Sequence, residues 1–227
     1  MPYQLTIKNA LPHGIIAAVA LPGDGEPVPE VVLDLLHASE RNIAVTMRGF
    51  RQCSFVGGRL AARAALQGLG RRPAPILQDA HGAPIPPDDL SVSISHKNKL
   101  AVAIVARASL GTLGIDLEML DPARPGISAR VLRPEEQSAV DGLAEERQWT
   151  GTVLRFAIKE AIYKALAPRL QRYIGFEEAS VMPGVNGDAV VTLHLQSGPE
   201  PESIEARYTW LDGAVLATVR ATWPTPA

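Results

Sequence analysis

The sequence has a single cysteine and no long apolar run. Cys53 has no partner for an internal disulfide, and we expect it to be a small buried hydrophobic residue. No stretch approaches the ~18 consecutive apolar residues that a membrane span requires. The run at 14–21 is short and is closed by Pro22 and Gly23, so it predicts a buried strand rather than the core of a signal peptide. These absences predict a cytoplasmic protein with no membrane partner.

The chain also lacks an excess of charge of either sign. Its 22 Lys and Arg residues and 24 Asp and Glu residues give a formal net charge of −2 at pH 7. Domains that bind nucleic acid are usually markedly basic, so we expect no nucleic-acid partner. The 227 residues are 46% hydrophobic, which is sufficient for one large globular domain or two small ones.

The stretch from Leu154 to Leu166 has the periodicity of a helix with a mixed polar and aromatic face. We expect this face to carry Phe156, Lys159, Glu160, Tyr163 and Lys164, which recur at intervals of three and four residues. Glu160 and Lys164 could be an ordinary solvated i, i+4 pair, which contributes about 0.2–0.5 kcal/mol. The alternative, a functional site, depends on a second acidic cluster upstream.

That second cluster is Gly114-Ile-Asp-Leu-Glu118, where apolar and acidic residues alternate as in a strand. We expect its two apolar residues to face a core, and Asp116 and Glu118 to face the other way. Two neighbouring carboxylates repel each other unless they share a cation. Glu160 from an adjacent helix would complete a site of oxygen ligands, which Mg²⁺ prefers. Mn²⁺ favours the same ligands, so the choice between these metals stays open.

Arginines accompany a long helix that we expect over residues 46–69, ended by Gly70. The pair Gly57 and Gly58 inside it is tolerable if another part of the protein approaches the backbone closely there. Arg48 and Arg51 precede this glycine pair in the sequence, and Arg59 follows it directly. They could simply solvate the helix, or they could bind phosphate oxygens, and the sequence leaves both alternatives open.

Residues 90–95 predict a strand whose serines, Ser91, Ser93 and Ser95, lie on one face. His96 ends this strand, and basic residues follow it. A histidine in such a position can hold a phosphate, although an isolated histidine is more often a structural hydrogen-bonding group.

The order of predicted elements divides the chain into two similar halves. Helices followed by several strands occur twice, and the halves meet near residues 108–112. We therefore predict an α+β fold with an N-terminal half over 1–110, which carries the arginine-bearing helix. The C-terminal half, over 111–227, carries the predicted carboxylate metal site. The groove between the halves would be a suitable place for a cofactor.

Three motifs in their order along the chain resemble the Sfp-type 4′-phosphopantetheinyl transferases. They are Ser93-Ile-Ser-His96, Gly114-Ile-Asp-Leu-Glu118 and Phe156-Ala-Ile-Lys-Glu-Ala-Ile-Tyr-Lys164. The resemblance extends over about residues 45–180 and includes 55–63, 82–84 and 175–178. It implies a pseudo-dimer of two α/β halves with coenzyme A in the cleft between them. We expect such a chain to act as a monomer.

The resemblance implies an enzyme that transfers the 4′-phosphopantetheine group of coenzyme A to a serine of an apo acyl or peptidyl carrier protein. Adenosine 3′,5′-bisphosphate is released. Carriers of fatty-acid, polyketide and nonribosomal-peptide synthesis all stay open. By the same resemblance, Asp116, Glu118 and Glu160 are the Mg²⁺ ligands. Glu160 also acts as general base on the serine, and Lys164 offsets charge on the leaving diphosphate.

The resemblance further implies a set of coenzyme A-binding residues. They are Arg51, Arg59, His81, Ser95, His96, Asp116 and Lys164. Many members carry a basic residue before the Gly-x-Pro sequence, where this chain has Gln78-Asp-Ala-His81, so that His81 or backbone groups would replace it. Phe156 stands where several members have tryptophan. Lys159 is next to the site and could instead be a charge that packs the helix.

Two other functions remain as alternatives. The first is a carrier-protein or coenzyme A-binding module that has kept the fold and lost the chemistry, although all three carboxylates and Lys164 are present. The second is another Mg²⁺-dependent phosphate hydrolase. Such an enzyme does not need the arginine-bearing helix, and the sequence has no Walker-type Gly-x-x-x-x-Gly-Lys loop.

Overall fold

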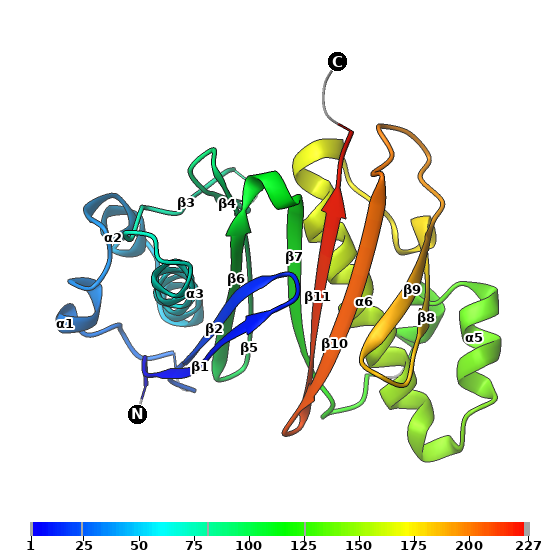
Figure 1. The fold of residues 1–227 in the computed structure, drawn as a ribbon. Coiled ribbons are helices and arrows are strands. Elements are labelled where there is room, and N and C mark those ends of the chain that lie inside the picture. The colour runs from blue at the N-terminus through cyan, green and yellow to red at the C-terminus, as the bar shows by residue number, and fades with distance from the viewer. Residues whose placement is uncertain (1, 24, 81, 125, 225–227) are drawn as a thin grey trace. The chain divides into compact units, whose positions relative to one another are not determined.

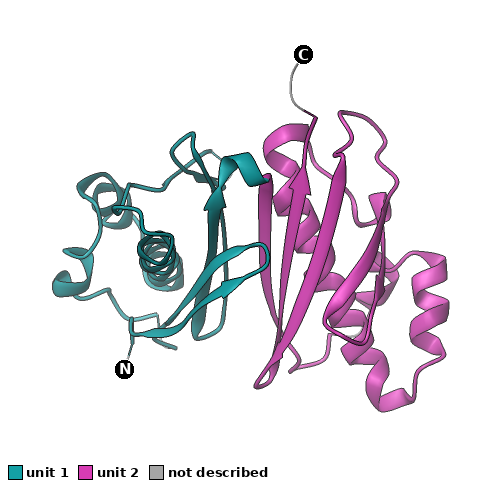
Figure 2. Cartoon of the chain, viewed as in Figure 1, with its two compact units in different colours: residues 1–110 teal, residues 111–227 magenta. Residues whose placement is uncertain are grey.

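The computed structural model describes residues 2–23, 25–80, 82–124 and 126–224. The chain divides into two compact units, residues 1–110 and 111–227 (Figure 2). In each unit, strand comes first, short helices follow, then one long helix and further antiparallel strands (Figure 1). The predicted α+β class with two similar halves is confirmed by this repeated order.

Unit 1 is an antiparallel sheet packed against one long helix. Its strands lie in the order β1 (Leu5–Leu11), β2 (Gly14–Ala20), β6 (Leu100–Arg107) and β5 (Leu90–Lys97). The long helix is α3 (Gly49–Gly68), preceded by α1 (Glu30–Leu33) and α2 (Ala38–Ala44). A small hairpin of β3 (Leu77–Gln78) and β4 (Pro84–Ile85) follows α3. The contacts of α3 with β2 and β6 enclose the hydrophobic core of this unit.

The glycine pair in α3 serves this packing. A Cβ at Gly58 would lie 2.8 Å from the side chain of Ile94, and one at Gly57 would overlap the side chain of Leu21. The expected close approach to the helix backbone is therefore confirmed. Cys53, on the same helix, is buried as expected, with Sγ 3.3 Å from the carbonyl oxygen of Glu26.

Unit 2 is a larger antiparallel sheet with its own long helix. Its strands lie in the order β7 (Thr112–Met119), β11 (Ala214–Thr222), β10 (Ser203–Leu211), β9 (Asp188–Leu193) and β8 (Ala179–Pro183). The helices are α4 (Ser128–Val131), α5 (Pro134–Asp141) and α6 (Glu145–Leu170), and a short 3₁₀ turn occupies Phe176–Glu178. α6 packs against β7 and β11, which creates the core of this unit.

The strand β7 approaches α6 more closely than a side chain would permit. A Cβ at Gly114 would overlap the carbonyl oxygen of Ala161 on α6. Gly114 is paired with Val219 of β11, and Val219 belongs to the core that includes α6. Residues opposite one another in a sheet share a face, so the face of β7 that carries Gly114 is covered by α6.

Asp116 and Glu118 lie on this helix-covered face. Their partners on β11 are Ala217 and Val215, which both belong to the core with α6. The alternation predicted for β7 is confirmed, with the carboxylates on the face opposite to Ile115 and Leu117, but the carboxylate face is covered by α6 and is not open to solvent. Ile115 and Leu117 are buried too, on the opposite face, so alternation alone could not tell which face α6 covers.

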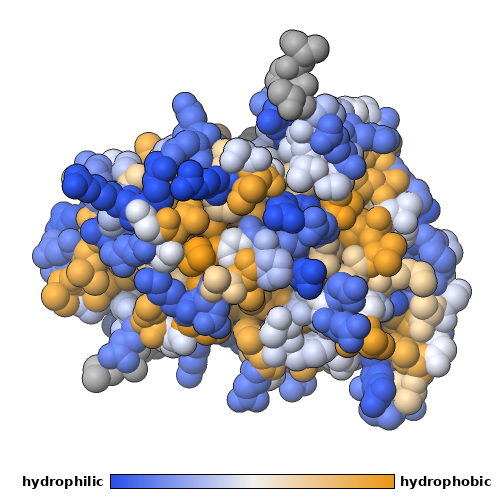
Figure 3. Space-filling view, viewed as in Figure 1, coloured by the Kyte–Doolittle hydropathy of each residue, from blue (hydrophilic) through white to orange (hydrophobic). Residues whose placement is uncertain are grey.

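The surface of each unit mixes apolar and polar side chains. Figure 3 shows hydrophobic residues exposed among hydrophilic ones in both units. Among the large apolar residues, Val185, Tyr173 and Val31 are strongly exposed. Within the described part of the chain, none of the helices combines the length and the apolar character needed to cross a membrane.

Candidate active site

Unit 1 contains a cavity of about 470 Å³ beside α3. Arg51 and Arg59 line it from α3, where a separation of eight residues returns them to the same side of the helix. His96 lines it from the end of β5, and Gln78 from the β3–β4 hairpin. The structure therefore brings together the three residues that the sequence assigned to the nucleotide phosphates.

Arg59 has a structural role in the wall of this cavity. Its Nε and Nη2 donate to the carbonyl oxygens of Ile76 and Leu77, at 2.8 and 3.0 Å. The guanidinium also lies 4.2 Å above the ring of Phe55. Burial lowers the pKa of Arg59 to about 10, against the opposing effect of the Glu40 carboxylate. Arg59 therefore stays charged at neutral pH while it holds the segment before Gln78 against α3.

Other arginines of this region donate hydrogen bonds to backbone carbonyl oxygens. Arg48 Nη1 donates to the carbonyl oxygens of Val45 and Met47, each at 2.7 Å. Arg63 Nη1 donates to the carbonyl oxygen of Leu35 at 2.8 Å. Arg51, in contrast, is exposed at the cavity. Of the arginines on α3, Arg51 is thus the one best placed to meet a ligand.

Ser95, a predicted coenzyme A-binding residue of unit 1, does not line this cavity. Ser95 is paired with Val102 of β6 and is buried on the face of β5 opposite to His96, because successive residues of a strand point to opposite faces. His81 lies outside the described residues. Gln78, which the sequence marked only as a departure, occupies a place in the cavity wall instead.

In unit 2, basic side chains accompany both carboxylates of β7. Lys164 Nζ lies 2.7 Å from Asp116 Oδ1 and donates to the carbonyl oxygen of Ile115 at 3.0 Å. Arg124 Nη2 lies 2.7 Å from Glu118 Oε2. Asp116 and Glu118 are both buried, so these cations balance charges that would otherwise be costly to remove from water.

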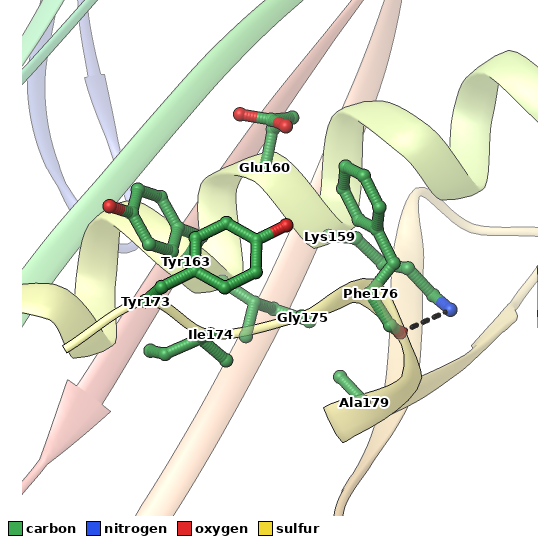
Figure 4. A pocket seen from close by; sticks show the side chains of 9 residues that line it. Lys159, Glu160, Tyr163, Tyr173, Ile174, Gly175, Phe176 and Ala179 are labelled. Carbon is green, nitrogen blue, oxygen red and sulfur yellow. Dashed lines mark hydrogen bonds between the residues drawn. The ribbon is translucent and has the colours of Figure 1, made fainter. Parts of the chain in front are cut away.

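Glu160 lies on α6 between Trp149 and Lys164. α6 runs antiparallel to β7, because Lys164 contacts Asp116 while Trp149, at the other end of the helix, donates to the carbonyl oxygen of Leu120. Glu160 lines a cavity of about 150 Å³ with Tyr163, Tyr173 and Phe176 among others, and Figure 4 shows its carboxylate beside the tyrosine rings.

The donor set suits a divalent metal, although the described residues do not form a closed metal site. Among them, no group of three or more His, Cys, Asp or Glu side chains is gathered closely enough to hold an ion. Asp116 and Glu118 nevertheless stand two residues apart on one strand face, and α6, which carries Glu160, packs against this strand. All-oxygen, mostly carboxylate ligands are those that Mg²⁺ prefers.

Lys159 does not share the surroundings of Lys164. The two lysines are five residues apart, which corresponds to about 140° around a helix. Lys159 Nζ is buried and donates to Glu136 Oε2 at 2.6 Å, and to the carbonyl oxygens of Val131 and Phe176 at 2.8 and 2.9 Å (Figure 4). The expectation of one common helix face is wrong for Lys159, and its alternative role as a packing charge is confirmed.

Glu136, the partner of Lys159, was not recognised from the sequence. Its Oε1 accepts from the backbone N–H of Val181 at 2.7 Å, and its Oε2 from that of Arg133 at 2.8 Å. Burial lowers the pKa of Lys159, and the hydrogen bond that it donates to Glu136 opposes this shift only in part. Glu136 is the third residue of a helix that begins at Pro134, a common capping position, which was the available signal.

A second charged pair holds the other end of the cavity wall. Arg172 donates to Glu178 through Nη1 and Nη2, at 2.8 and 2.6 Å. Glu178 also accepts from the backbone N–H groups of Gly175 and Gln196. The hydrogen bond from Arg172 is the main cause that lowers the pKa of Glu178 to about 2. The segment from Tyr173 to Phe176 is thus fixed at both ends.

Comparison with known proteins gives the family. The model described as 4′-phosphopantetheinyl transferase N-terminal domain matches residues 39–106, and that of the 4′-phosphopantetheinyl transferase superfamily matches residues 112–219. The chain belongs to the 4′-phosphopantetheinyl transferase superfamily. This phosphopantetheinyl transferase is therefore an enzyme, and the family resemblance drawn from its three motifs is confirmed.

Individual relatives extend over most of this phosphopantetheinyl transferase. 4′-Phosphopantetheinyl transferase Svp of Streptomyces mobaraensis is 32% identical over 179 residues, which are 75% of this chain and 72% of Svp. PptT of Mycobacterium tuberculosis is 31% identical over 179 residues, which are 74% of this chain and 78% of PptT. Among solved structures, holo-[acyl-carrier-protein] synthase of Thermotoga maritima overlaps 51% of this chain and 64% of its own, with 23% identity and a TM-score of 0.42.

Proposed function

We propose that this enzyme transfers the 4′-phosphopantetheine group from coenzyme A to a serine hydroxyl of an apo acyl or peptidyl carrier protein. The observation that carries the proposal is the ion pair between Lys164 of α6 and Asp116 of β7, two residues from Glu118 on the same strand face, in a chain of this family. The reaction forms a bond between the serine oxygen and the phosphorus of the phosphopantetheine. It breaks the bond from that phosphorus to the bridging oxygen, and adenosine 3′,5′-bisphosphate leaves.

The cavity of unit 1 is proposed to bind the nucleotide phosphates. Arg51 is exposed at this cavity and His96 ends the strand beside it. A guanidinium can bind two phosphate oxygens at once, which suits a terminal phosphate such as the 3′-phosphate of coenzyme A. Arg59 contributes positive charge, while its Nε and Nη2 groups stay hydrogen-bonded to the carbonyl oxygens of Ile76 and Leu77.

The residues of unit 2 are proposed to perform the transfer. Glu160 would accept the proton of the attacking serine, and Lys164, already directed at Asp116, would donate to the diphosphate as charge develops on the leaving oxygen. Asp116, Glu118 and Glu160 would hold Mg²⁺, which when bound supplies neutralising positive charge to the diphosphate. The rest of the catalysis is positioning.

The cavity beside Glu160 is proposed to take the pantetheine arm. Its volume of about 150 Å³ is small, and Tyr163, Tyr173 and Phe176 give it an aromatic lining. The arm is the uncharged and narrow part of coenzyme A, so it matches such a lining better than the nucleotide does. We also propose that the enzyme acts as a cytoplasmic monomer, without nucleic-acid or membrane partners.

The intact mass of a purified apo carrier protein tests the proposal directly. After incubation with the enzyme, coenzyme A and Mg²⁺, we expect the carrier to gain one phosphopantetheine, and to gain none with a chelator present. Fatty-acid, polyketide and peptide carriers are compared in parallel. Hydrolysis of coenzyme A without a carrier would support a phosphate hydrolase instead. Tight coenzyme A binding with no transfer to any carrier would support a binding module.

Carboxylate variants in the same assay test the assigned residues. We expect Asp116→Asn and Glu160→Gln each to lower the rate of transfer at least 100-fold, about 2.7 kcal/mol of barrier, with the thermal unfolding temperature little changed. Glu146→Gln, an exposed carboxylate at the start of the same helix, is the matched control and should transfer normally. Normal turnover by either of the first two variants would disprove the assignment.

A further inference from the structure

Arg124 is held against Glu118 by the surrounding structure. Its Nη2 lies 2.7 Å from Glu118 Oε2, and the side chains of Arg124 and Glu118 are 39% and 7% exposed. The guanidinium carbon lies 5.3 Å from the centre of the Phe156 ring and 6.0 Å from that of Trp149. Both rings belong to α6, and a cation over an aromatic face is attracted to it. Arg124 therefore has a defined place rather than that of a freely moving surface charge.

This place conflicts with the proposed metal site. A divalent ion bound to Glu118 would stand within a few Å of the guanidinium, and two positive charges at that distance repel each other strongly in a partly buried setting. Asp116 is similarly paired with Lys164, so the protein supplies cations of its own to both carboxylates of β7. Lys164 has a proposed part in the transfer, whereas Arg124 lies in the loop after β7, outside the three family motifs.

We propose that Arg124 competes with the divalent cation for Glu118, so that the metal binds only when Arg124 leaves this carboxylate. The proposal rests on the assignment of Glu118 as a metal ligand under the proposed function. Its consequence is weak metal binding by the free enzyme. Coenzyme A adds a negatively charged diphosphate, which gives a displaced guanidinium another partner and favours the metal. Metal and coenzyme A are thus expected to bind cooperatively, with the same coupling in both directions.

Titration calorimetry of Mg²⁺ into the enzyme without coenzyme A tests this. We expect Arg124→Gln to bind Mg²⁺ about tenfold more tightly than the unchanged enzyme, since a charge close to the ligand is removed. Arg130→Gln is the matched control, because it makes the same change of charge at an exposed position on the neighbouring helix α4, and its affinity should stay within about twofold. Arg124→Lys keeps the charge and should stay closer to the unchanged enzyme.

A double variant shows whether the effect acts through Glu118. In a Glu118→Gln background, Arg124→Gln should give no further gain in Mg²⁺ affinity, because the shared ligand is gone. Equal or weaker Mg²⁺ binding by Arg124→Gln, with both proteins folded by circular dichroism, would overturn the competition alone. No Mg²⁺ binding by any of these proteins would overturn it together with the metal assignment. The carrier mass assay decides transfer separately, so the two failures are distinguishable.

Discussion

Each side of α6 carries an ion pair between a lysine and a carboxylate, but the two pairs differ in how deeply they are buried. On the side facing α5 and β8, Lys159 and Glu136 are 1% and 2% exposed. On the side facing β7, Lys164 and Asp116 are 26% and 7% exposed. The buried pair also bonds to backbone groups of several elements, whereas Lys164 of the β7 pair is partly open to solvent. Burial, more than the residue types, therefore separates a pair that stabilises the fold from a pair that is free to take the proposed catalytic role.

Unit 1 repeats this distinction with arginines on a single helix. Arg59 is buried and donates to two carbonyl oxygens, while Arg51 is exposed at the same cavity. A side chain already engaged by the fold has fewer groups to offer to a ligand. The phosphate-binding contribution of α3 should therefore be concentrated in Arg51, with Arg59 acting through the shape of the wall.

The largest expected effect comes from breaking the buried pair. Lys159→Met leaves Glu136 buried without its cation, which should lower the free energy of unfolding by about 3–5 kcal/mol. Chemical denaturation followed by circular dichroism measures it. Lys164→Met is the matched control on the other side of α6 and should cost much less, because Lys164 is partly exposed. An equal loss of unfolding free energy in the two variants would contradict the conclusion that the buried pair stabilises the fold more than the partly exposed pair does.

A smaller effect should follow from removing the exposed arginine of unit 1. Arg51→Ala is expected to raise the KM for coenzyme A about tenfold, the size of one charge-assisted phosphate contact, with kcat little changed. Dephospho-coenzyme A, which lacks the 3′-phosphate, should be affected less. Steady-state transfer with both substrates measures this, and Arg72→Ala, at another exposed arginine, is the control. The same loss on both substrates would remove the 3′-phosphate from the role of Arg51.

The smallest effect concerns the pair of Arg172 with Glu178, which fastens the cavity wall in unit 2. The pKa of Glu178 lies near 2, below the ordinary value of 4.5, so the folded protein favours the charged carboxylate. The resulting stability is fully present above about pH 4.5 and is lost as the pH falls towards 2. We expect Glu178→Gln to reduce the fall in unfolding temperature between pH 6 and pH 3. Glu177→Gln, at the exposed neighbour, should leave that fall unchanged.

Periodicity predicted the long helices and most strands, but not the boundaries set by local capping. Two short helices precede α3, because α1 ends at Leu33 and α2 begins after His37. The reason is a capping box, in which Glu40 accepts from the backbone N–H of His37. α6 likewise begins at Glu145, before the stretch from Leu154 to Leu166 that showed the helical periodicity.

The candidate site was predicted as a set of residues rather than as an arrangement. Asp116, Glu160 and Lys164 could be named from motifs, because their order along the chain resembles a family. The face of β7 covered by α6 could not, since both faces are buried. The separation of Ser95 from His96 shows the same limit, because a strand assigns neighbours to opposite faces without saying which face meets a cavity.

Pairs between distant segments were beyond the sequence. Lys159 and Glu136 lie 23 residues apart and meet only because α5 folds back along α6. Arg124 had no motif to mark it, and its pairing with Glu118 depends on the course of the loop after β7. A single sequence gives the charge of each residue but not its ion-pair partner. Only the structure shows which lysines and arginines are buried in contacts of the fold and which are exposed at a cavity.

The contact between Gly114 and Ala161 fixes the distance between α6 and the strand that carries Asp116 and Glu118. Because only a hydrogen atom stands between the strand and the carbonyl oxygen of the helix, no rotamer change can alter their spacing. Asp116 and Lys164 sit on two backbones whose separation is fixed by van der Waals radii. Whatever movement substrate or metal binding requires must come from side-chain torsions and loops. The backbones of β7 and α6 thus form a rigid support, and conformational freedom is confined to the ends of the charged side chains.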